Sequence, residues 1–592
     1  MIFPGQKVLR VDLDRGSVEE EELKDEIIER YVGGKGLAAY LMYRELKQGV
    51  DPLSPENKLF IFGGPLAFIY PTFTRTIVAS KSPLTNTFSD SNAGGSFAVE
   101  LRRAGYLGIV VEGASDKLVC LKIDREGRRL FECENLRLRT TYEVGEYFPE
   151  YSVLTIGPAG ENLVRISGVF IDMRRKPRSR PGVAGRGGLG AVMGSKKLKA
   201  IIVRGFMREE DLARNVSPDL RTRLSREYLK FVLENVIPGI GVGGNLPVFR
   251  VSAEARILPV KNFRQGIHEG WEQLVDDEWA KIKIGKLSCP TCPVACGARM
   301  RMDSRETERI EYETVAMNGS NLGITDKRML IEINNELNEL GLDSISAGSI
   351  AAFVAELSER GLIDLKIRWG DAEAFMKLYR DIAYRSGLGD ILAEGIAHAS
   401  KYFNAEEIAL HIKGLDIPAY DPRGVVGMSL AYATADRGGD HLRAWTVAVE
   451  VSTRPSIEDL VKLTINLQNR NAALWTLVAC DNIVSNSIKP PEPMIEIYIK
   501  MLNSLGLEYD MERFLELGER IYNIARMFNA REGFSRRDDK LPPRFYERRE
   551  DTGWYINRES FEKMLDRYYQ LRGWSDLGIP TPETLRRLGI EV

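Results

Sequence analysis

The stretch 184–200 reads Ala-Gly-Arg-Gly-Gly-Leu-Gly-Ala-Val-Met-Gly-Ser-Lys-Lys-Leu-Lys-Ala and is the most informative part of the 592-residue sequence. It contains the spacing G-x-G-x-x-G, which in a dinucleotide-binding fold follows a strand and opens a long helix. Here it follows turn-forming residues at 178–182, and only residues 191–198 separate it from a strand-like run at 200–203. A dinucleotide fold is therefore disfavoured. The small residues would let backbone N–H groups approach an anion, and Arg186 adds positive charge, so the loop predicts either a phosphate-binding turn or a purely structural one.

Upstream of this loop the chain is rich in turns and short β-branched runs. The runs at 59–62, 77–79, 107–111 and 200–203 predict strands of one β-rich domain covering roughly the first 205 residues. Two further glycine-rich stretches fall in this domain: 33–37, expected to open the first helix, and 90–97. Each alone predicts a tight turn or a helix start, but three in one domain suggest that it wraps a large polar ligand.

Downstream of Glu209 the pattern changes to charged, amphipathic helices. The clearest is predicted between an N-cap at Asp326 and a stop at Gly341, because Met329, Leu330, Ile333, Leu337 and Leu340 share one face. A glycine-rich belt at 414–439 interrupts the helices and is expected to separate a middle from a last domain.

The six cysteines favour metal binding over a disulfide framework. Cys289, Cys292 and Cys296 follow the spacing C-x2-C-x3-C, which lets three thiolates converge on one metal group. A cubane cluster needs a fourth ligand, and Cys480 at the end of an apolar run is the best candidate. The other two, Cys120 and Cys133, lie in strand-like stretches and are expected to be small buried hydrophobes. A structural zinc site, which more often pairs two C-x2-C units, is the alternative.

Composition excludes several classes of partner. With 82 basic and 84 acidic residues the net charge is −2, which offers no general attraction for nucleic acid or acidic lipid. The N-terminus lacks the pattern of a signal peptide, and no apolar run approaches the roughly 20 residues that span a bilayer. A cytoplasmic protein without nucleic-acid or membrane partners is expected.

Taken together, these motifs resemble the tungsten-containing aldehyde ferredoxin oxidoreductase family. The resemblance runs in order from about residue 5 to about 540, and the run ending at Ala200 is its most specific part. Its other matches are 33–37, 81–85, 91–97, the cysteine motif, Glu311-Tyr312-Glu313-Thr314, Gly341-Leu342-Asp343, Tyr420-Asp421-Pro422-Arg423-Gly424 and His441-Leu442-Arg443-Ala444.

The resemblance implies an α+β multidomain architecture. A base domain of two β-sheets (residues 1–207) would lie under two mostly helical domains (208–412 and 413–592), which together enclose a bis-pterin cofactor. Its tungsten would be held by pterin sulfurs and by no protein side chain, so molybdenum remains possible.

The resemblance also implies the site residues. Cofactor contacts are expected from Arg75, Asn92, Gly94, Gly95, Val183, Ala184, Gly185, Arg186, Asn338, Leu342, Asp343, Arg443 and Ala479. Asn92 and Ala184 would offer backbone carbonyls to a bridging magnesium, a hard cation suited to oxygen ligands. A [4Fe-4S] cluster would be held by Cys289, Cys292, Cys296 and Cys480, with Arg75 linking Cys480 to a pterin.

Two side chains match the active-site positions of the family, Glu313 and His441. Oxidising an aldehyde to an acid requires an oxygen nucleophile, loss of a proton and loss of two electrons. A carboxylate can take the proton, and a histidine can donate a hydrogen bond to the carbonyl oxygen as negative charge develops. The electron acceptor implied is ferredoxin or a small iron–sulfur subunit.

The sequence departs from the family at two places. The family's second D-x-x-G-L-C motif is here Trp475-Thr-Leu-Val-Ala-Cys480, which keeps only the cysteine, whereas the first copy begins with Asn338 in place of Asp. Contacts to the second pterin are thus in doubt. The E-x-x-H motif that bridges subunits in some members is also missing, since Glu332 is followed by Ile-Asn-Asn335. An oligomer without that metal site is expected.

Three other functions stay open at this stage. The first is an enzyme of the same cofactor class acting on another low-potential substrate, such as an aromatic acid thioester. The second is a cofactor-carrying subunit without turnover, and the third a zinc-stabilised nicotinamide enzyme.

Overall fold

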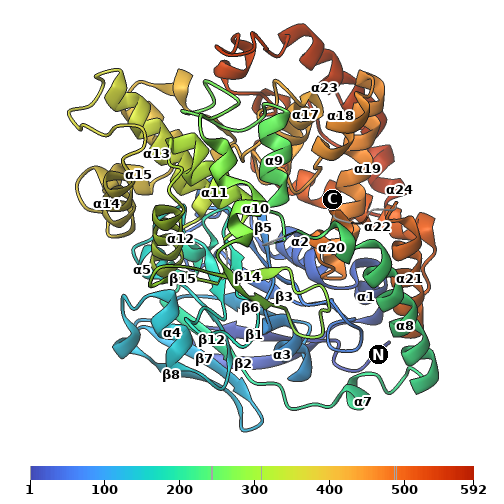
Figure 1. Ribbon diagram of the computed structural model, residues 1–592. Coiled ribbons are helices and arrows are strands. Elements are labelled where there is room, and N and C mark those ends of the chain that lie inside the picture. Colours follow the sequence, from blue (N-terminus) through green and yellow to red (C-terminus); the bar gives the residue numbers. More distant parts are fainter. Residues whose placement is uncertain (1, 242–243, 309, 486, 488–489, 592) are drawn as a thin grey trace.

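Two six-stranded sheets form the N-terminal part of the molecule, as expected (Figure 1). The structure, a computed structural model, describes residues 2–241, 244–308, 310–485, 487 and 490–591. The first sheet has the order β2-β1-β6-β3-β4-β5, from β1 Lys7–Asp12, β2 Ser17–Glu22, β3 Leu59–Phe62, β4 Thr76–Lys81, β5 Phe88–Ala93 and β6 Gly108–Glu112. The second has the order β11-β10-β9-β12-β7-β8, from β7 Val119–Asp124, β8 Gly127–Glu132, β9 Ser152–Thr155, β10 Val169–Ile171, β11 Gly182–Ala184 and β12 Leu198–Val203.

The two sheets share one apolar core. Leu9, Ile61 and Val111 of the first sheet pack in the same cluster as Leu154 and Ile201 of the second. The strand-like runs at 59–62, 77–79, 107–111 and 200–203 are confirmed as β3, β4, β6 and β12. Alternation of side chains between two faces lets each sheet place its apolar residues against the other sheet.

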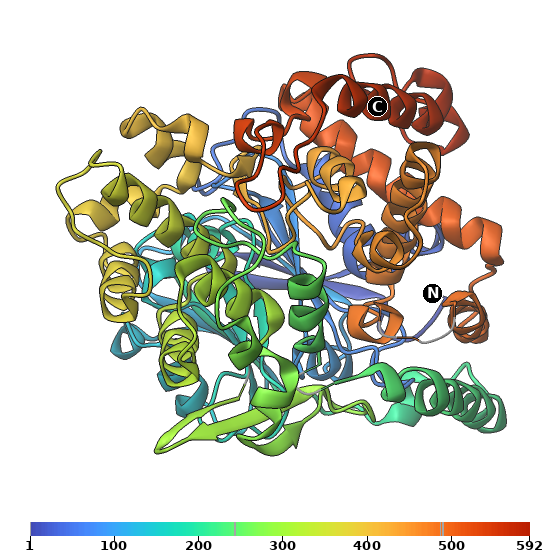
Figure 2. The same ribbon diagram turned by 45° about the horizontal axis from the view of Figure 1, so that its top comes forward.

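The edge strands β5 and β11 lie close together where the two sheets meet. Gly182 of β11 approaches Gly94 so closely that a Cβ there would lie 2.1 Å from the Gly94 carbonyl oxygen. Only glycine permits this approach. Figure 2 shows the mostly helical remainder of the chain, coloured green to red, around the blue and cyan strands of the sheets.

Six helices belong to the N-terminal part: α1 Asp25–Tyr31, α2 Gly34–Glu45, α3 Phe97–Arg103, α4 Thr141–Tyr147, α5 Pro158–Glu161 and α6 Leu189–Ser195. The stretch 33–37 therefore opens the second helix and not the first, because α1 precedes it. The expectation of only turn residues before the 184–200 loop is also corrected, since the short antiparallel strand β11 begins at Gly182. With the seven-residue α6 after it, the loop still lacks the parallel strand and long helix of a dinucleotide fold.

The rest of the chain is mostly helical. The middle helices are α7 Glu209–Leu212, α8 Pro218–Asn235, α9 Pro247–Glu254, α10 Asp276–Ala280, α11 Tyr312–Asn318, α12 Lys327–Leu340, α13 Ser344–Glu359, α14 Ala372–Ala383, α15 Leu388–Ala393 and α16 Ile396–Tyr402. The last are α17 Val426–Thr434, α18 Val447–Thr453, α19 Ile457–Thr476, α20 Asp481–Ser485, α21 Glu492–Ser504, α22 Met511–Arg531, α23 Arg558–Arg572 and α24 Pro582–Arg587. Short strands are β13 Lys283–Leu287, β14 Gly297–Met302 and β15 Arg305–Thr307, and the pair β16 His411–Ile412 and β17 Leu415–Asp416.

Helix α12 has the boundaries that its sequence predicts. The Asp326 carboxylate accepts a hydrogen bond from the backbone N–H of Arg328, and Gly341 ends the helix in the left-handed conformation (φ 82°). These are the common ways to satisfy orphan groups at helix ends. In contrast, the belt at 414–439 is not free of helix, because it contains α17.

The division between middle and last domain at residue 412 stays a prediction. The hairpin of β16 and β17 lies across this point, and one apolar cluster includes residues from both sides, such as Leu330 and Leu430. Within the described residues, no helix has both the length and the apolar character needed to cross a bilayer.

Cys120 and Cys133 form a disulfide, which corrects the expectation of two free thiols. Their Cα atoms are 6.1 Å apart, and both residues are buried. Cys120 lies in β7 opposite Phe131 of β8, and Cys133 follows β8 directly, so antiparallel pairing brings the two side chains together. The bridge staples the outer hairpin of the second sheet, far in sequence from the other cysteines.

Candidate active site

A polar cavity lies where the two sheet edges meet the helices. Eight of the predicted cofactor residues line it: Arg75, Asn92, Val183, Gly185, Arg186, Asn338, Leu342 and Asp343. Glu313 and His441 line the same cavity. The structure thus brings together residues that are up to 366 positions apart, as Arg75 and His441 show.

The remaining predicted cofactor residues lie next to the cavity. Gly94 and Gly95 are beside Cys289, with the Gly95 N–H 3.4 Å from its sulfur. Ala184 is buried in β11, paired with Val169, and Ala479 is buried after α19. The magnesium contacts of Asn92 and Ala184 stay a prediction.

Several cavity residues were not foreseen from the sequence. Polar members of this group that were not among the predicted site residues are Ser91, Arg180, Asn245, Glu311, Thr314, Ser344, Arg437, Asp481 and Asn482. Arg180 could have been noticed, since it lies in the same turn as the glycine-rich loop; its guanidinium pairs with Glu311. Ser91, Glu311 and Thr314 lie within stretches that match the family, whereas the remaining residues come from elements whose proximity has no local signal in the sequence.

Many polar atoms in this cavity are buried with no hydrogen-bond partner among the described residues. They are Arg75 Nε, Asn92 Oδ1, Arg180 Nε, Arg186 Nε, Glu313 Oε1, Asn338 Nδ2 and His441 Nδ1. Buried polar groups are normally satisfied because an unmade hydrogen bond costs about 1–3 kcal/mol. The mixture of donors and acceptors fits a ligand that carries both, together with negative charge that the arginines can meet. A pterin with its phosphate has this chemistry.

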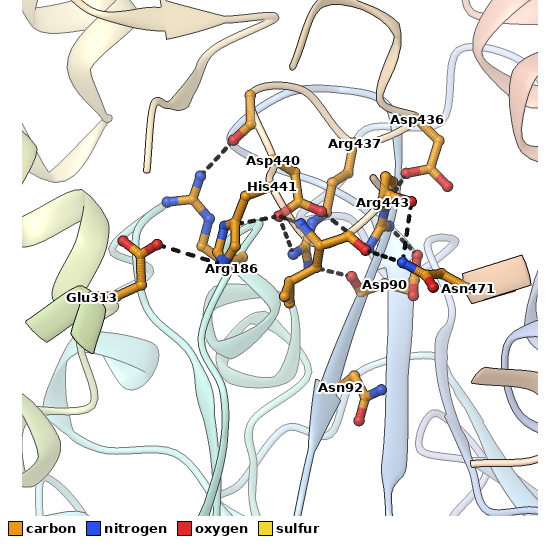
Figure 3. Close-up of polar contacts among 12 residues, drawn as sticks. Asp90, Asn92, Arg186, Glu313, Asp436, Arg437, Asp440, His441, Arg443 and Asn471 are labelled. Carbon is orange, nitrogen blue, oxygen red and sulfur yellow. Dashed lines mark hydrogen bonds and ion pairs between the residues drawn. The ribbon is translucent and has the colours of Figure 1, made fainter. Parts of the chain in front are cut away.

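Glu313 and His441 face each other across this cavity (Figure 3). Glu313 lies in the first turn of α11, and one of its carboxyl oxygens accepts a hydrogen bond from the Ala419 N–H at 3.0 Å. The other oxygen is 3.5 Å from His441 Nε2. The His441 ring also lies against Tyr420, with ring centroids 5.6 Å apart.

Burial shifts the pKa values of this pair in opposite directions. Burial raises the pKa of Glu313 to about 8, and it lowers the pKa of His441 to about 4. At neutral pH Glu313 therefore mostly carries its proton and His441 is uncharged. Perturbed groups of this kind in a cavity are candidates for proton transfer.

A network of six buried charges, which we call the charged network, lies beside His441. It consists of three acids and three bases: Lys35, Asp90, Asp436, Arg437, Asp440 and Arg443. Lys35 Nζ lies 3.0 Å from Asp90 and 2.7 Å from Asp436, and Arg443 pairs with Asp90, Asp436 and Asp440. Arg443, a predicted cofactor residue, thus has its guanidinium engaged by carboxylates.

Asp440 connects this network to the catalytic candidates. It accepts from Arg437 at 2.9 Å, and its carboxylate is 3.9 Å from His441 Nδ1 (Figure 3). Burial alone would raise the pKa of Asp440, but the positive charge of Arg437 and Arg443 holds this pKa well below its usual range. Asp440 therefore stays ionised next to an uncharged histidine.

The four free cysteines gather beside the cavity. Cys289, Cys292 and Cys296 lie on the loop between β13 and β14, and Cys480 lies between α19 and α20. Burial raises the pKa of Cys292 to about 12, and the proximity of Cys480 and Cys289 adds to this effect, so these sulfurs are close. Arg75 Nη2 donates to the Cys480 sulfur at 3.1 Å. Among the described residues, no three His, Cys, Asp or Glu side chains are arranged around the position of a single ion.

A second, mainly apolar compartment adjoins the polar cavity. The two share Asn245, His441, Leu442, Asp481 and Asn482. The other residues that line the compartment are Val248, Tyr420, Trp445, Asn471, Leu474, Val484 and Ser485. Among these described lining residues none is Lys or Arg, so the compartment fits an uncharged organic group.

Comparison with known proteins gives consistent matches over nearly the whole chain. The family model for the N-terminal domain of aldehyde ferredoxin oxidoreductase matches residues 8–205, and that for domains 2 and 3 matches residues 233–590. The tungsten-containing aldehyde ferredoxin oxidoreductase of Pyrococcus furiosus is 36% identical, with 99% of this chain and 98% of that protein covered. The WOR-like subunit of an aliphatic sulfonate oxidoreductase from the same organism is 31% identical, with 99% and 96% covered.

A solved structure is also similar. It is the active site complex BamBC of benzoyl coenzyme A reductase with 1,5-dienoyl-CoA, at a TM-score of 0.85 and 27% identity, covering 99% of this chain and 97% of that chain.

Proposed function

This chain belongs to the aldehyde ferredoxin oxidoreductase family and is an oxidoreductase, and from that premise we propose that it oxidises aldehydes to carboxylic acids. The observation that carries the proposal is the Glu313–His441 pair: both residues line the polar cavity, and His441 also lines the apolar compartment. An aldehyde whose carbon chain fills the compartment would present its carbonyl group to this pair.

The cofactors are proposed from the chemistry of the donors. Arg75, Arg186 and the unpartnered amide atoms Asn92 Oδ1 and Asn338 Nδ2 fit a bis-pterin with tungsten, and the four thiols fit a [4Fe-4S] cluster. A zinc ion with Zn–S bonds of about 2.3 Å would require sulfurs grouped tightly around one position, and the described residues show no such group. When bound, the tungsten pterin accepts an electron pair and the cluster conducts single electrons to an acceptor. Magnesium at the pterin phosphates belongs to the same proposal.

The side chains of this chain then manage oxygen and protons. The overall change adds water to the aldehyde and releases an acid, two electrons and two protons. His441, uncharged, is placed to donate a hydrogen bond to the aldehyde oxygen, and Glu313 in its ionised form takes a proton from the attacking water. The carboxylate of Asp440, 3.9 Å from His441 Nδ1, favours the ring orientation in which His441 Nε2 points toward Glu313.

The acceptor is proposed to be ferredoxin or a small iron–sulfur subunit, and the cell compartment to be the cytoplasm. The oligomeric state remains a prediction; where the E-x-x-H motif would start, Glu332 forms an ion pair with Arg305.

Steady-state kinetics with matched aldehydes test the function. The holoenzyme, purified anaerobically, is expected to reduce a viologen dye or ferredoxin with benzaldehyde, and to prefer it at least tenfold in kcat/KM over 4-carboxybenzaldehyde. The reason is that a carboxylate in a compartment without a cationic partner loses hydration. Absence of aldehyde-dependent reduction by protein that holds tungsten and iron would overturn the proposal.

A further inference from the structure

The cavity is bounded by two chain corners of the same design. In the first, α12 ends, Gly341 takes the left-handed conformation (φ 82°), and Asp343 starts α13. In the second, α19 ends, Val478 takes the left-handed conformation (φ 54°), and Asp481 starts α20. Each corner therefore delivers a carboxylate to the same cavity, two or three residues after its left-handed residue.

The second corner keeps this backbone against the preference of its own residue. A β-branched side chain rarely adopts a positive φ, and glycine is the residue that suits it. Such a conformation persists only where the surroundings fix it. Here the Val478 carbonyl accepts a hydrogen bond from the Arg75 N–H at 3.3 Å, and the Trp475 carbonyl lies so near Gly34 that a Cβ on that glycine would be 2.2 Å away. The corner is thus held in a shape that positions Cys480 and Asp481.

Asp481 has the environment of a ligand-binding carboxylate. One of its oxygens accepts from the Trp475 indole N–H, and the other is 3.5 Å from the Asn92 amide nitrogen. Trp475 is itself fixed, since it is 1% exposed and lies under the cations of Lys35 and Arg443. Asp481 has no ion pair among the described residues; burial raises its pKa, and the positive charge of nearby Arg75 opposes that rise.

We propose that Asp481 binds the pterin at the second corner, with Trp475 as the positioning residue that holds its carboxylate. Trp475 stands where the D-x-x-G-L-C motif has an aspartate. The carboxylate of Asp481 supplies the chemistry of that missing aspartate, because its two oxygens can accept hydrogen bonds from the paired amino and ring N–H groups of a pterin. The unpartnered Asn92 Oδ1 and Arg75 Nε beside it supply an acceptor and a donor for the same ligand. This inference rests on the bis-pterin cofactor of the proposed function.

The test counts pterin per chain, a quantity that does not depend on turnover. Wild type, Asp481→Asn, Asp481→Glu and Trp475→Phe are purified anaerobically, and pterin is measured as its oxidised fluorescent derivative, with tungsten and iron by elemental analysis. Asp481→Asn is expected to lose about half of the pterin or more, while about four irons remain because the cysteines are unchanged. Asp481→Glu should recover part of the loss, and Trp475→Phe should lie between Asp481→Asn and wild type.

Ser485→Ala is the matched control, because Ser485 lies on the same short helix α20 but lines only the apolar compartment. It should keep the pterin content of the wild type. Full pterin in Asp481→Asn together with lost activity would assign Asp481 to the substrate and overturn the inference, as would unchanged pterin with unchanged activity. Wild-type protein without pterin would instead overturn the proposed function itself.

Discussion

The charged network and the Glu313–His441 pair are both buried and adjoin each other at Asp440 and His441. They differ in how burial is compensated: one keeps its charges in ion pairs, and the other is neutral. The charged network matches three acids with three bases, and every member is engaged. Among the described residues Glu313 forms no ion pair with a lysine or arginine; burial outweighs the nearby charge of Arg186, and both Glu313 and His441 are mostly neutral at pH 7. Paired charges hold a structure together, whereas neutral, shifted groups in a cavity can exchange protons.

The largest effect is expected from changing the neutral pair. Glu313→Gln keeps the size and neutrality of the protonated side chain but cannot accept a proton, so kcat/KM should fall by about 10²- to 10⁴-fold. The melting temperature should stay near that of the wild type. The matched control is Glu450→Gln, which alters another largely buried carboxyl of raised pKa outside the cavity; activity lost equally in both variants would contradict the assignment.

A change in the charged network should instead lower the stability of the fold. Asp436→Asn leaves Lys35 and Arg443 with less negative charge in a buried place, and removing one partner of such a network costs about 3–5 kcal/mol of stability. The denaturant midpoint should drop clearly. Glu227→Gln breaks an exposed pair with Lys500 and should leave the midpoint unchanged. A stable Asp436→Asn protein would remove the contrast between the two groups.

The pH profile should show the smallest but most specific effect. Because the pKa of Glu313 lies at about 8, its ionised form becomes more abundant as pH rises, so kcat/KM should increase about tenfold per unit below pH 8 and level off above it. The groups that face Glu313 are His441, Arg186, Asp343 and Asp440, and of these His441 titrates only near pH 4. Glu313→Gln should abolish the rising limb. A profile that is flat from pH 6 to 9 in the wild type would show that this carboxyl is not the base.

The sequence predicted well the features that depend on local residues. Helix α12 with its Asp326 cap and Gly341 stop needs only contacts within a few residues, and its prediction is confirmed. The two N-terminal sheets followed from short β-branched runs and from the family resemblance.

Features that depend on distant contacts could not be predicted. Lys35 meets Asp90 and Asp436 across 55 and 401 positions, and no local pattern marks a lysine that will be buried between them. The disulfide between Cys120 and Cys133 was not predicted for a different reason. Cys120 and Cys133 are 13 residues apart on one hairpin, and a predicted turn at 124–127 would have paired their strands. The small number of cysteines in the whole chain argued against disulfides, but it says nothing about two cysteines on the same hairpin.

The most direct test of the account is whether an aldehyde reduces the iron–sulfur cluster of this protein. Anaerobic holoenzyme is mixed with benzaldehyde without an external acceptor, and electron paramagnetic resonance is recorded before and after mixing. The account predicts that the signal of a reduced [4Fe-4S] cluster appears only after the aldehyde is added, and that it fails to appear in Glu313→Gln on the same time scale. Protein that holds tungsten and about four irons but gives no aldehyde-dependent signal would contradict the account.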